Sequence, residues 1–186
     1  VLRTLIQKGV VTCFEREIYR APKSQKVSGF SLAELELSSE QQRVFEGIRE
    51  LCRKDEANAA LLFGVTGSGK TQIFVKLIED CLARGQQAML LVPEISLTPQ
   101  VLAKFHGLFG EKIAVLHSGL SMGERLDEYK RIKEGKAEIS IGTRSSIFAP
   151  FSRLGLIILD EEGEHSYKSD ITPRYHARDI AKFRCV

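Results

Sequence analysis

The sequence predicts an α/β fold built on a mainly parallel, doubly wound sheet. From about Leu37 onward, short apolar runs alternate with amphipathic helical patterns, an order typical of parallel strands joined by helices. A glycine-rich turn begins at Gly64, directly after the first apolar run, and the acidic pair Asp160 and Glu161 follows the last. The chain has 186 residues, of which 43% are hydrophobic, and this is enough for the core of one such domain.

Two N-terminal segments are predicted to lie outside this domain. Residues 1–22 carry an apolar pattern that ends at Gly9 and is followed by a β-like run. This pattern fits a helix and a hairpin wing, but it is too short to bury a core of its own. The composition of residues 23–36 predicts a linker. Because the first residue is Val1 and no signal-peptide pattern follows, we expect a segment of a longer protein.

The domain is predicted to open with a helix near Leu37. Ser38 or Ser39 can cap this helix, and Gln41 or Gln42 can complete a capping box three residues later. Apolar residues then recur at helical spacing, namely Val44, Ile48 and Leu51.

Five strands are expected, each a short apolar run. They cover residues 60–63, 88–92, 113–116, 137–141 and 154–159. Helices are expected over residues 73–81, where Gly85 ends the pattern, over residues 99–109, and after Ser121, which can form a second capping box with Glu124. Because the strands are apolar on both faces, we expect helices on both sides of the sheet.

The glycine-rich turn matches the phosphate-binding motif G-x-x-x-x-G-K-[ST]. Its residues are Gly64, Val65, Thr66, Gly67, Ser68, Gly69, Lys70 and Thr71. The turn follows a predicted strand and precedes a predicted helix, which is the context that the motif requires. Backbone N–H groups of such a loop curl around a phosphate at a helix N-terminus. In this motif Lys70 reaches the β- and γ-phosphates and Thr71 binds Mg²⁺, so we expect an ATP and Mg²⁺ site.

Asp160 and Glu161 provide the second half of the expected nucleotide site. They emerge where an apolar strand ends, and ligands of open α/β sheets bind at this edge. Asp160 would hold the Mg²⁺ shell and Glu161 would activate the attacking water; the alternative is a buried strand that merely ends in surface acids. Two adjacent acids favour hydrolysis over a guanine-nucleotide switch, and the sequence has no Asn-Lys-x-Asp signature.

Charge and cysteine content exclude little by themselves. The formal net charge is +3, with 27 basic and 24 acidic side chains, as expected of a mixed, solvated surface. The four cysteines form no C-x-x-C pair, so we expect no zinc site within these residues. No run of about 18 apolar residues occurs, and we expect no membrane association.

Several motifs together resemble the replication-restart DNA helicases of superfamily 2 in bacteria. They lie at residues 64–71, 92–100 (Val-Pro-Glu-Ile-Ser-Leu-Thr-Pro-Gln), 117–119 (His-Ser-Gly), 141–145 (Ile-Gly-Thr-Arg-Ser), 160–162, 166–168 and 174–179 (Arg-Tyr-His-Ala-Arg-Asp). The resemblance implies a RecA-like P-loop NTPase lobe over residues 37–186, preceded by a winged-helix remnant at 1–22 and a linker at 23–36. It also implies a second lobe after residue 186 that carries an arginine finger and zinc-binding cysteines.

The resemblance implies a set of ligand-binding residues. Gln41 would read adenine, although it also suits a helix cap. Thr98, Arg144 and Ser145 would hold the DNA backbone, for which hydroxyls and a guanidinium are suitable; a surface salt bridge is the alternative for Arg144. An aromatic-rich loop would couple DNA contact to hydrolysis through Tyr167, Lys168, Arg174, Tyr175 and Arg178, unless it is an ordinary charged loop. His117 could equally be a packing or capping residue.

The chain departs from the family pattern at Gly163. The family box is Asp-Glu-Glu-His, whereas here Gly163 takes the histidine position and His165 lies two residues later. Because that histidine is expected to link the γ-phosphate site to the DNA-binding loops, the departure concerns coupling and not ATP binding.

The function implied is that of a cytoplasmic ATP-dependent 3′→5′ DNA helicase in replication restart. Its partners would be forked and single-stranded DNA, primosome proteins and single-strand-binding proteins. We expect these 186 residues to bind Mg-ATP, to hydrolyse it very slowly and to unwind nothing alone. The alternatives are a fork-remodelling translocase of the same superfamily and a scaffold that binds ATP and DNA without coupling them.

Overall fold

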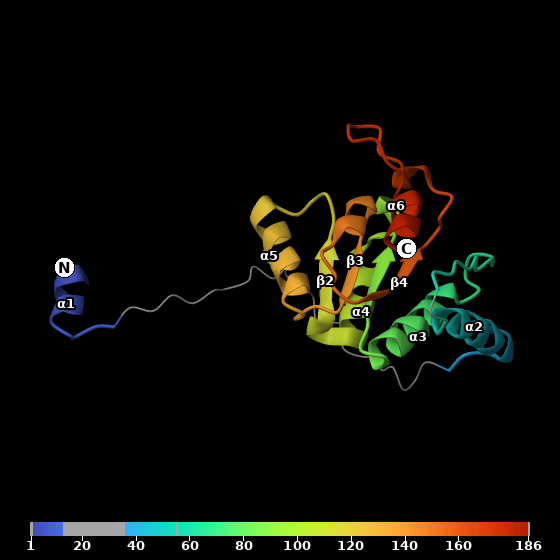
Figure 1. Ribbon diagram of the computed structural model, residues 1–186, viewed down its shortest axis with the longest axis horizontal. Helices are drawn as coiled ribbons and strands as arrows, with labels where there is room; N and C mark the ends of the chain where they lie inside the picture. Colours follow the sequence, from blue (N-terminus) through green and yellow to red (C-terminus); the bar gives the residue numbers. More distant parts are fainter. Residues whose placement is uncertain (1, 13–35, 55, 186) are drawn as a thin grey trace.

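The centre of the molecule is a four-stranded parallel sheet with the order β2-β3-β1-β4 (Figure 1). The computed structural model describes residues 2–12, 36–54 and 56–185. The strands are β1 (Gln87–Leu91), β2 (Ile113–Leu116), β3 (Ile139–Gly142) and β4 (Leu154–Leu159). Leu90 pairs with Ile141 of β3 on one side and with Ile158 of β4 on the other. These findings confirm the predicted α/β class and four of the five predicted strands.

Several of the helices begin or end at a capping residue. They are α1 (Leu2–Gln7), α2 (Ser39–Cys52), α3 (Lys70–Ala83), α4 (Pro99–Phe109), α5 (Met122–Lys133) and α6 (Ala177–Arg184). Ser38 and Ser121 each form a complete capping box with the residue three positions later. Thr98 caps α4, with a proline in the first turn. Gly85, which follows α3, has φ +70°, a value that glycine adopts without steric cost.

Two apolar layers cover the sheet, one on each face. Ile78 of α3 and Phe105 of α4 pack with Leu90 on one face. On the other face Leu91 packs with residues of α5, α6 and the short helix η4 (Arg144–Phe148). Successive β1 residues therefore point to opposite layers, as the period of a strand requires. The prediction of helices on both sides of the sheet is confirmed.

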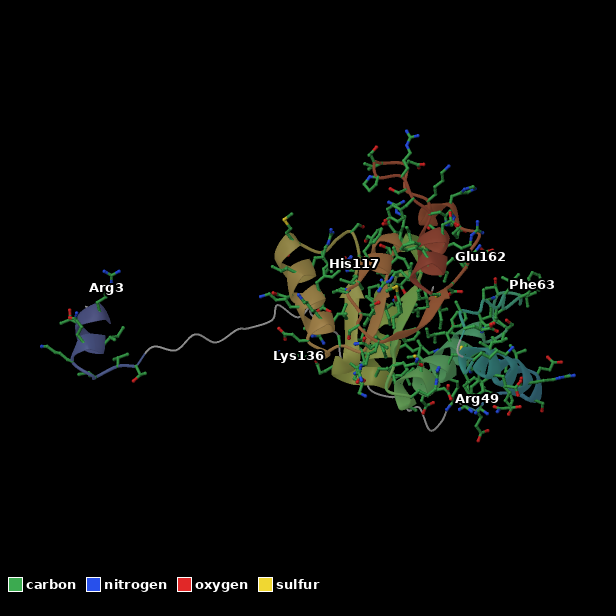
Figure 2. The ribbon with its side chains drawn as sticks, in the orientation of Figure 1. Arg3, Arg49, Phe63, His117, Lys136 and Glu162 are labelled. Atoms are coloured by element: carbon green, nitrogen blue, oxygen red, sulfur yellow. The ribbon has the colours of Figure 1, made fainter. Side chains whose placement is uncertain are left out.

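The strand predicted at residues 60–63 is wrong. Residues 59–64 have no strand structure, and Leu61 and Phe63 are 77% and 91% exposed. Phe63 lies at the periphery of the molecule (Figure 2). A strand needs a neighbour for its backbone N–H and C=O groups, and among the described residues no backbone hydrogen bond joins this segment to β4. Within residues 60–63 only Leu62 packs against the core, in a cluster that Leu156 also contacts.

A side chain of α5 bonds to the backbone of β2 at the edge of the sheet. Glu128, which is 1% exposed, accepts a hydrogen bond from the Val115 N–H over 3.1 Å. Arg131 pairs with the same carboxylate at 2.8 Å and also donates to the Glu111 carbonyl. The Glu128 carboxylate thereby occupies one backbone N–H of β2 that a foreign strand could otherwise use.

The N-terminal divisions of the chain remain predictions. The structure contains α1, but residues 10–12, the β-like run of the predicted wing, have no strand structure. The rest of the wing and most of the linker fall on residues 13–35, which lie outside the described residues. A winged-helix remnant is therefore not shown. Among the residues that the structure describes, no helix is long and apolar enough to span a membrane.

Candidate nucleotide and nucleic-acid site

The glycine-rich turn forms a compact loop at the start of α3. Gly67 and Gly69 have φ values of +82° and +81°, in the left-handed region that favours glycine. The ammonium group of Lys70 lies inside the loop, where Nζ donates to the carbonyl oxygens of Gly64 at 2.7 Å and Val65 at 3.1 Å. The loop thus carries backbone and lysine donors in the arrangement that suits a phosphate.

Gln41 connects the beginning of α2 to this loop. Its Nε2 donates to the Ser68 carbonyl at 3.0 Å, and its Oε1 accepts from the Ser38 N–H at 2.9 Å. A Cβ built at Gly69 would collide with Gln41 Nε2, so a side chain there would displace this amide as well as being disfavoured by the positive φ. The predicted helix cap is confirmed, and the same amide also supports the phosphate loop. Its predicted contact with adenine stays a prediction.

Asp160 follows β4 at the carboxyl edge of the sheet. Its backbone N–H donates to the Leu91 carbonyl at 2.9 Å, which continues the pairing of β4 with β1. Burial raises the pKa of the Asp160 carboxyl, while the Glu161 N–H and the positive charge of Lys70 act in the opposite direction. The charge of Lys70 thus acts on the Asp160 carboxyl, as expected if the phosphate loop and this acid lie near each other.

Glu161 has an unusual backbone conformation. Among the described residues it is the one non-glycine with positive φ, at 50°, and its side chain is exposed. Its N–H donates to Asp160 Oδ1 at 3.1 Å. Such strain persists where the surrounding structure imposes it and is concentrated at functional sites, so the local geometry supports a functional role for this pair of acids.

The donor set fits a nucleotide-bound Mg²⁺ better than a protein-only metal site. Within the described residues, no group of three or more His, Cys, Asp or Glu could hold a metal ion. Mg²⁺ in nucleotide sites is held by one or two protein oxygens together with phosphate oxygens and water. Thr71 and Asp160 are both partly buried beside the loop and are of the required chemical type.

Tyr167 connects the loop after β4 to two strands. Its side chain is fully buried, and its hydroxyl lies 3.0 Å from the Leu91 carbonyl oxygen and 2.7 Å from the Asp160 carbonyl oxygen. Burial raises the pKa of this hydroxyl far above its ordinary value, and the nearby charges of Asp160, Glu161 and Glu164 raise it further. The hydroxyl is therefore a neutral donor, and in this structure the ring is covered. Its predicted contact with DNA remains a prediction.

Arg144 and Tyr175 are occupied by contacts within the same region. Arg144 donates to the Ser166 carbonyl at 3.2 Å and to the Lys168 carbonyl. Its guanidinium also lies over the Tyr175 ring, 5.8 Å from the centroid. A surface salt bridge does not describe these bonds, because the partners of Arg144 are backbone oxygens. The predicted contact of Arg144 with a DNA phosphate stays a prediction.

Backbone pairing and an ion pair shape the rest of this loop. The Ser169 N–H donates to the Tyr175 carbonyl at 2.7 Å. Arg178 forms an ion pair with Glu162 at 3.0 Å, and Glu162 lies beside the last helix (Figure 2). His176 caps α6 through its Nδ1, which accepts from the Arg178 N–H.

Four other predicted DNA-binding groups can be placed. Lys168, Arg174 and Ser145 are exposed, and the segment from β4 to α6 extends beyond the carboxyl edge of the sheet (Figure 1). Thr98 uses its hydroxyl to cap α4, accepting from the Val101 N–H at 3.3 Å. Lys168 and Arg174 of the loop are therefore exposed to the solvent. Arg144 and Tyr175 hold the loop through bonds to its backbone.

The structure shows the contacts of His117 and the surroundings of Gly163 and His165. His117 Nδ1 accepts from the Gly119 N–H at 3.1 Å within a turn, and the residue that caps the following helix α5 is Ser121. Gly163 is exposed, and a Cβ at this position would meet no heavy atom within 4 Å. His165 is exposed in the short helix η5 (His165–Tyr167). A Cβ at position 163 would therefore meet no obstacle in the loop.

Sequence reasoning missed Phe148 and Arg184. Phe148 contacts Tyr175 edge to face, with 5.0 Å between ring centroids. Arg184 donates to the carbonyl oxygens of Ile147 and Ala149, which lie 37 and 35 residues away along the chain. No local pattern encodes a partner at that separation, although an aromatic residue within a loop was a visible signal.

This geometry, a phosphate loop with paired acids and a basic loop at one sheet edge, is typical of nucleotide-driven nucleic-acid motors. A profile of the DEAD/DEAH box helicase family matches residues 38–182. The chain therefore belongs to the DEAD/DEAH box helicase family.

The relatives narrow this class to replication restart proteins. The chain is 51% identical over 181 residues to the replication restart protein PriA of Bacillus subtilis (strain 168), covering 97% of this chain and 22% of that protein. It is 42% identical over 184 residues to PriA of Synechocystis, covering 98% and 22%. The chain thus spans about a fifth of the length of these curated relatives.

A solved structure supports the fold independently. The structure of RecG bound to a three-way DNA junction matches with a TM-score of 0.62 and 25% identity, covering 76% of this chain and 20% of that chain. The RecA-like helicase lobe expected from the motifs is consistent with both the family profile and this match.

Proposed function

We propose that this chain is the ATP-binding motor lobe of a 3′→5′ replication-restart DNA helicase. The observation that carries the proposal is the meeting of Lys70, Asp160 and Tyr167 at one sheet edge. Through Tyr167, the basic loop that would meet DNA is bonded to the backbone of the acid that would meet Mg²⁺. This edge is where open α/β sheets bind their ligands.

ATP is proposed to bind along residues 64–71. The backbone N–H groups of the loop and the N-terminus of α3 hold the phosphates, and Gln41 contacts the adenine. Lys70 exchanges its bonds to the Gly64 and Val65 carbonyls for bonds to phosphate oxygens. Thr71 and Asp160 hold Mg²⁺, which neutralises phosphate charge when it is bound.

Glu161 is proposed to activate water for hydrolysis. It is exposed immediately beside Asp160, in a backbone conformation that is unusual for a residue other than glycine. A carboxylate at this place can accept a proton from water as a phosphate is attacked.

The chain alone is proposed to bind Mg-ATP but to hydrolyse it slowly. An arginine that stabilises transferring phosphate charge contributes about 10³–10⁵ in rate in related sites. The resemblance to restart helicases implies that this arginine belongs to another part of the full-length protein, which would leave the isolated lobe unable to unwind DNA.

DNA is proposed to cross the carboxyl edge of the sheet. Ser145 and the cap of α4 at Thr98 suit phosphate oxygens, which position a strand without reading its sequence. The exposed cations Lys168 and Arg174 add charge attraction. The similarity to PriA supports forked and single-stranded DNA as substrates, primosome and single-strand-binding proteins as partners, and the cytoplasm as location.

A fork-remodelling translocase is the second candidate. Its support is the fold similarity to RecG, which was solved on a three-way DNA junction. The 51% identity to a restart protein over nearly the whole chain favours the first proposal. An uncoupled scaffold would rest on Gly163 alone.

The test is steady-state ATP hydrolysis by the full-length protein with and without forked DNA. A motor is expected to hydrolyse ATP faster when the fork is present. A protein that binds both ligands without any stimulation would instead be a scaffold. Displacement assays on forks that carry only a 3′ or only a 5′ single-stranded arm would distinguish a 3′→5′ helicase from a junction translocase.

A further inference from the structure

Phe148 is an aromatic side chain that lies outside the buried core. It ends the short helix η4 and remains 49% exposed, whereas its neighbour Ile147 is fully buried. A half-exposed phenylalanine presents a flat apolar surface to the solvent, and such surfaces in a basic setting suit nucleobases.

The backbone around Phe148 is held on both sides. Arg184 donates to the carbonyl oxygens of Ile147 and Ala149, the residues that flank it. The Ala149 N–H donates to the Ser146 carbonyl at 2.9 Å. Because this segment is fixed before any ligand arrives, binding at Phe148 costs little conformational entropy.

A second aromatic ring supports Phe148 from the neighbouring loop. Tyr175 meets it edge to face, with 5.0 Å between centroids and 72° between ring planes, a favourable geometry for an aromatic pair. Arg144 lies over Tyr175 in turn. The side chains of Phe148, Tyr175 and Arg144 form one contact cluster that links η4 to the loop before α6.

The cluster of Phe148, Tyr175 and Arg144 has basic neighbours. Arg144 also binds the Lys168 carbonyl, so Lys168 is adjacent in space, and the backbone of Ser169 pairs with that of Tyr175. Lys168 and Arg174 are both exposed. Aromatic surface beside exposed cations matches the two demands of a single strand, since bases stack on the rings while phosphates pair with the cations.

We infer that Phe148 stacks on an unpaired base of single-stranded DNA. The inference rests on the proposed DNA-binding function and adds to it a specific base-contacting residue. Stacking of this kind is sequence-tolerant because every base has a π-face, so Phe148 would hold the strand without selecting a sequence.

The test compares three proteins on two oligonucleotides of equal length. Full chains of wild type, Phe148→Leu and Phe148→Tyr are titrated by fluorescence anisotropy against labelled oligo-dT and against an abasic strand. Phe148→Leu is expected to weaken oligo-dT binding about five- to a hundredfold and to leave abasic binding and the salt slope unchanged. Phe148→Tyr, which keeps a ring, is expected to bind as wild type does.

Controls separate stacking from loss of structure. Phe63→Leu removes an exposed ring, 91% exposed, from another part of the surface and is expected to change nothing. A 2-aminopurine base placed along the strand reports stacking directly in the wild type, because stacking changes its fluorescence and the chain has no tryptophan.

Several outcomes would overturn the inference. Equal weakening on both strands, unaltered oligo-dT binding by Phe148→Leu, or no fluorescence change at any 2-aminopurine position would exclude base stacking at Phe148 while leaving DNA binding intact. Failure of the wild type to bind either strand would instead reject the proposed DNA interface itself.

Discussion

The hydroxyl of Tyr167 lies 2.7 Å from the carbonyl oxygen of Asp160. This contact joins a buried side chain of the basic loop to the backbone of the acid proposed to hold Mg²⁺. Because Tyr167 also reaches the Leu91 carbonyl of β1, the loop is bonded to the carboxyl ends of the two neighbouring strands β1 and β4. A displacement of the loop would therefore move the backbone of Asp160.

Tyr167→Phe is expected to lower the free energy of unfolding by about 1–3 kcal/mol, because a buried carbonyl loses its hydrogen-bond donor. Urea denaturation of the two proteins measures this difference. Tyr175→Phe serves as the control, since the variant keeps the ring that contacts Phe148; an equal loss in both variants would contradict a special role for the Tyr167 hydroxyl.

The same bond predicts an alkaline dependence of stability. Burial raises the pKa of Tyr167 above the ordinary value of 10.0, so the folded protein retains this proton where the unfolded chain releases it. The stabilisation is complete below pH 10 and is lost as pH rises above it. Tyr167→Phe should flatten this part of the stability profile, and an unchanged profile would show that other groups cause it.

Asp160→Asn is expected to make the nucleotide-free chain more stable at neutral pH. The pKa of Asp160 is raised above its ordinary value of 3.8, with burial as the largest cause, so the ionised carboxylate costs folding energy above that pH. Thermal melts at pH 7 and pH 4 should show a gain that shrinks in acid. Loss of Mg-ATP hydrolysis in the full-length variant would accompany it, and a lower melting temperature at pH 7 would contradict the argument.

Lys70→Ala and Glu161→Gln should separate binding from turnover. The first variant removes the ammonium group that lies within the phosphate loop, so nucleotide affinity falls. The second keeps the side-chain length but removes the proton acceptor, so full-length protein should bind ATP normally and hydrolyse it at least about a hundredfold more slowly. Normal turnover by Glu161→Gln would assign water activation to another residue.

Arg144→Lys distinguishes support of the loop from contact with phosphate. Lysine keeps the positive charge but cannot reproduce the planar guanidinium that meets two carbonyls and the Tyr175 ring. Amide exchange of residues 166–176 should accelerate in the variant. Protection equal to wild type, combined with weaker DNA binding, would instead favour the phosphate contact.

Much of the fold follows from local patterns in the chain. The capping boxes at Ser38 and Ser121 and the apolar runs of four strands are short-range signals, and the structure uses them as predicted. Residues 60–63 are equally apolar, yet pairing depends on a neighbouring strand and not on composition. The pattern therefore identified a segment that is able to form a strand without showing whether it has a partner.

The residues of the candidate site likewise fall into those that a local motif predicts and those that it does not. The phosphate loop and the acids after β4 were visible as motifs because their chemistry requires contiguous residues. The contacts of Arg144 and Arg184 join backbone oxygens between 22 and 37 residues away, and carbonyl groups carry no residue identity. Such bonds cannot be recognised from the sequence of either partner.

The two sides of the sheet differ in one further respect. The Glu128 carboxylate occupies the Val115 N–H at the β2 side, whereas β4 ends the strand order on the other side. The two edges are therefore not equivalent as sites for an added strand, because at β2 such a strand would have to displace the Glu128 carboxylate from the Val115 N–H. The β4 edge leads directly to Asp160, so a strand added there would lie next to the proposed nucleotide site.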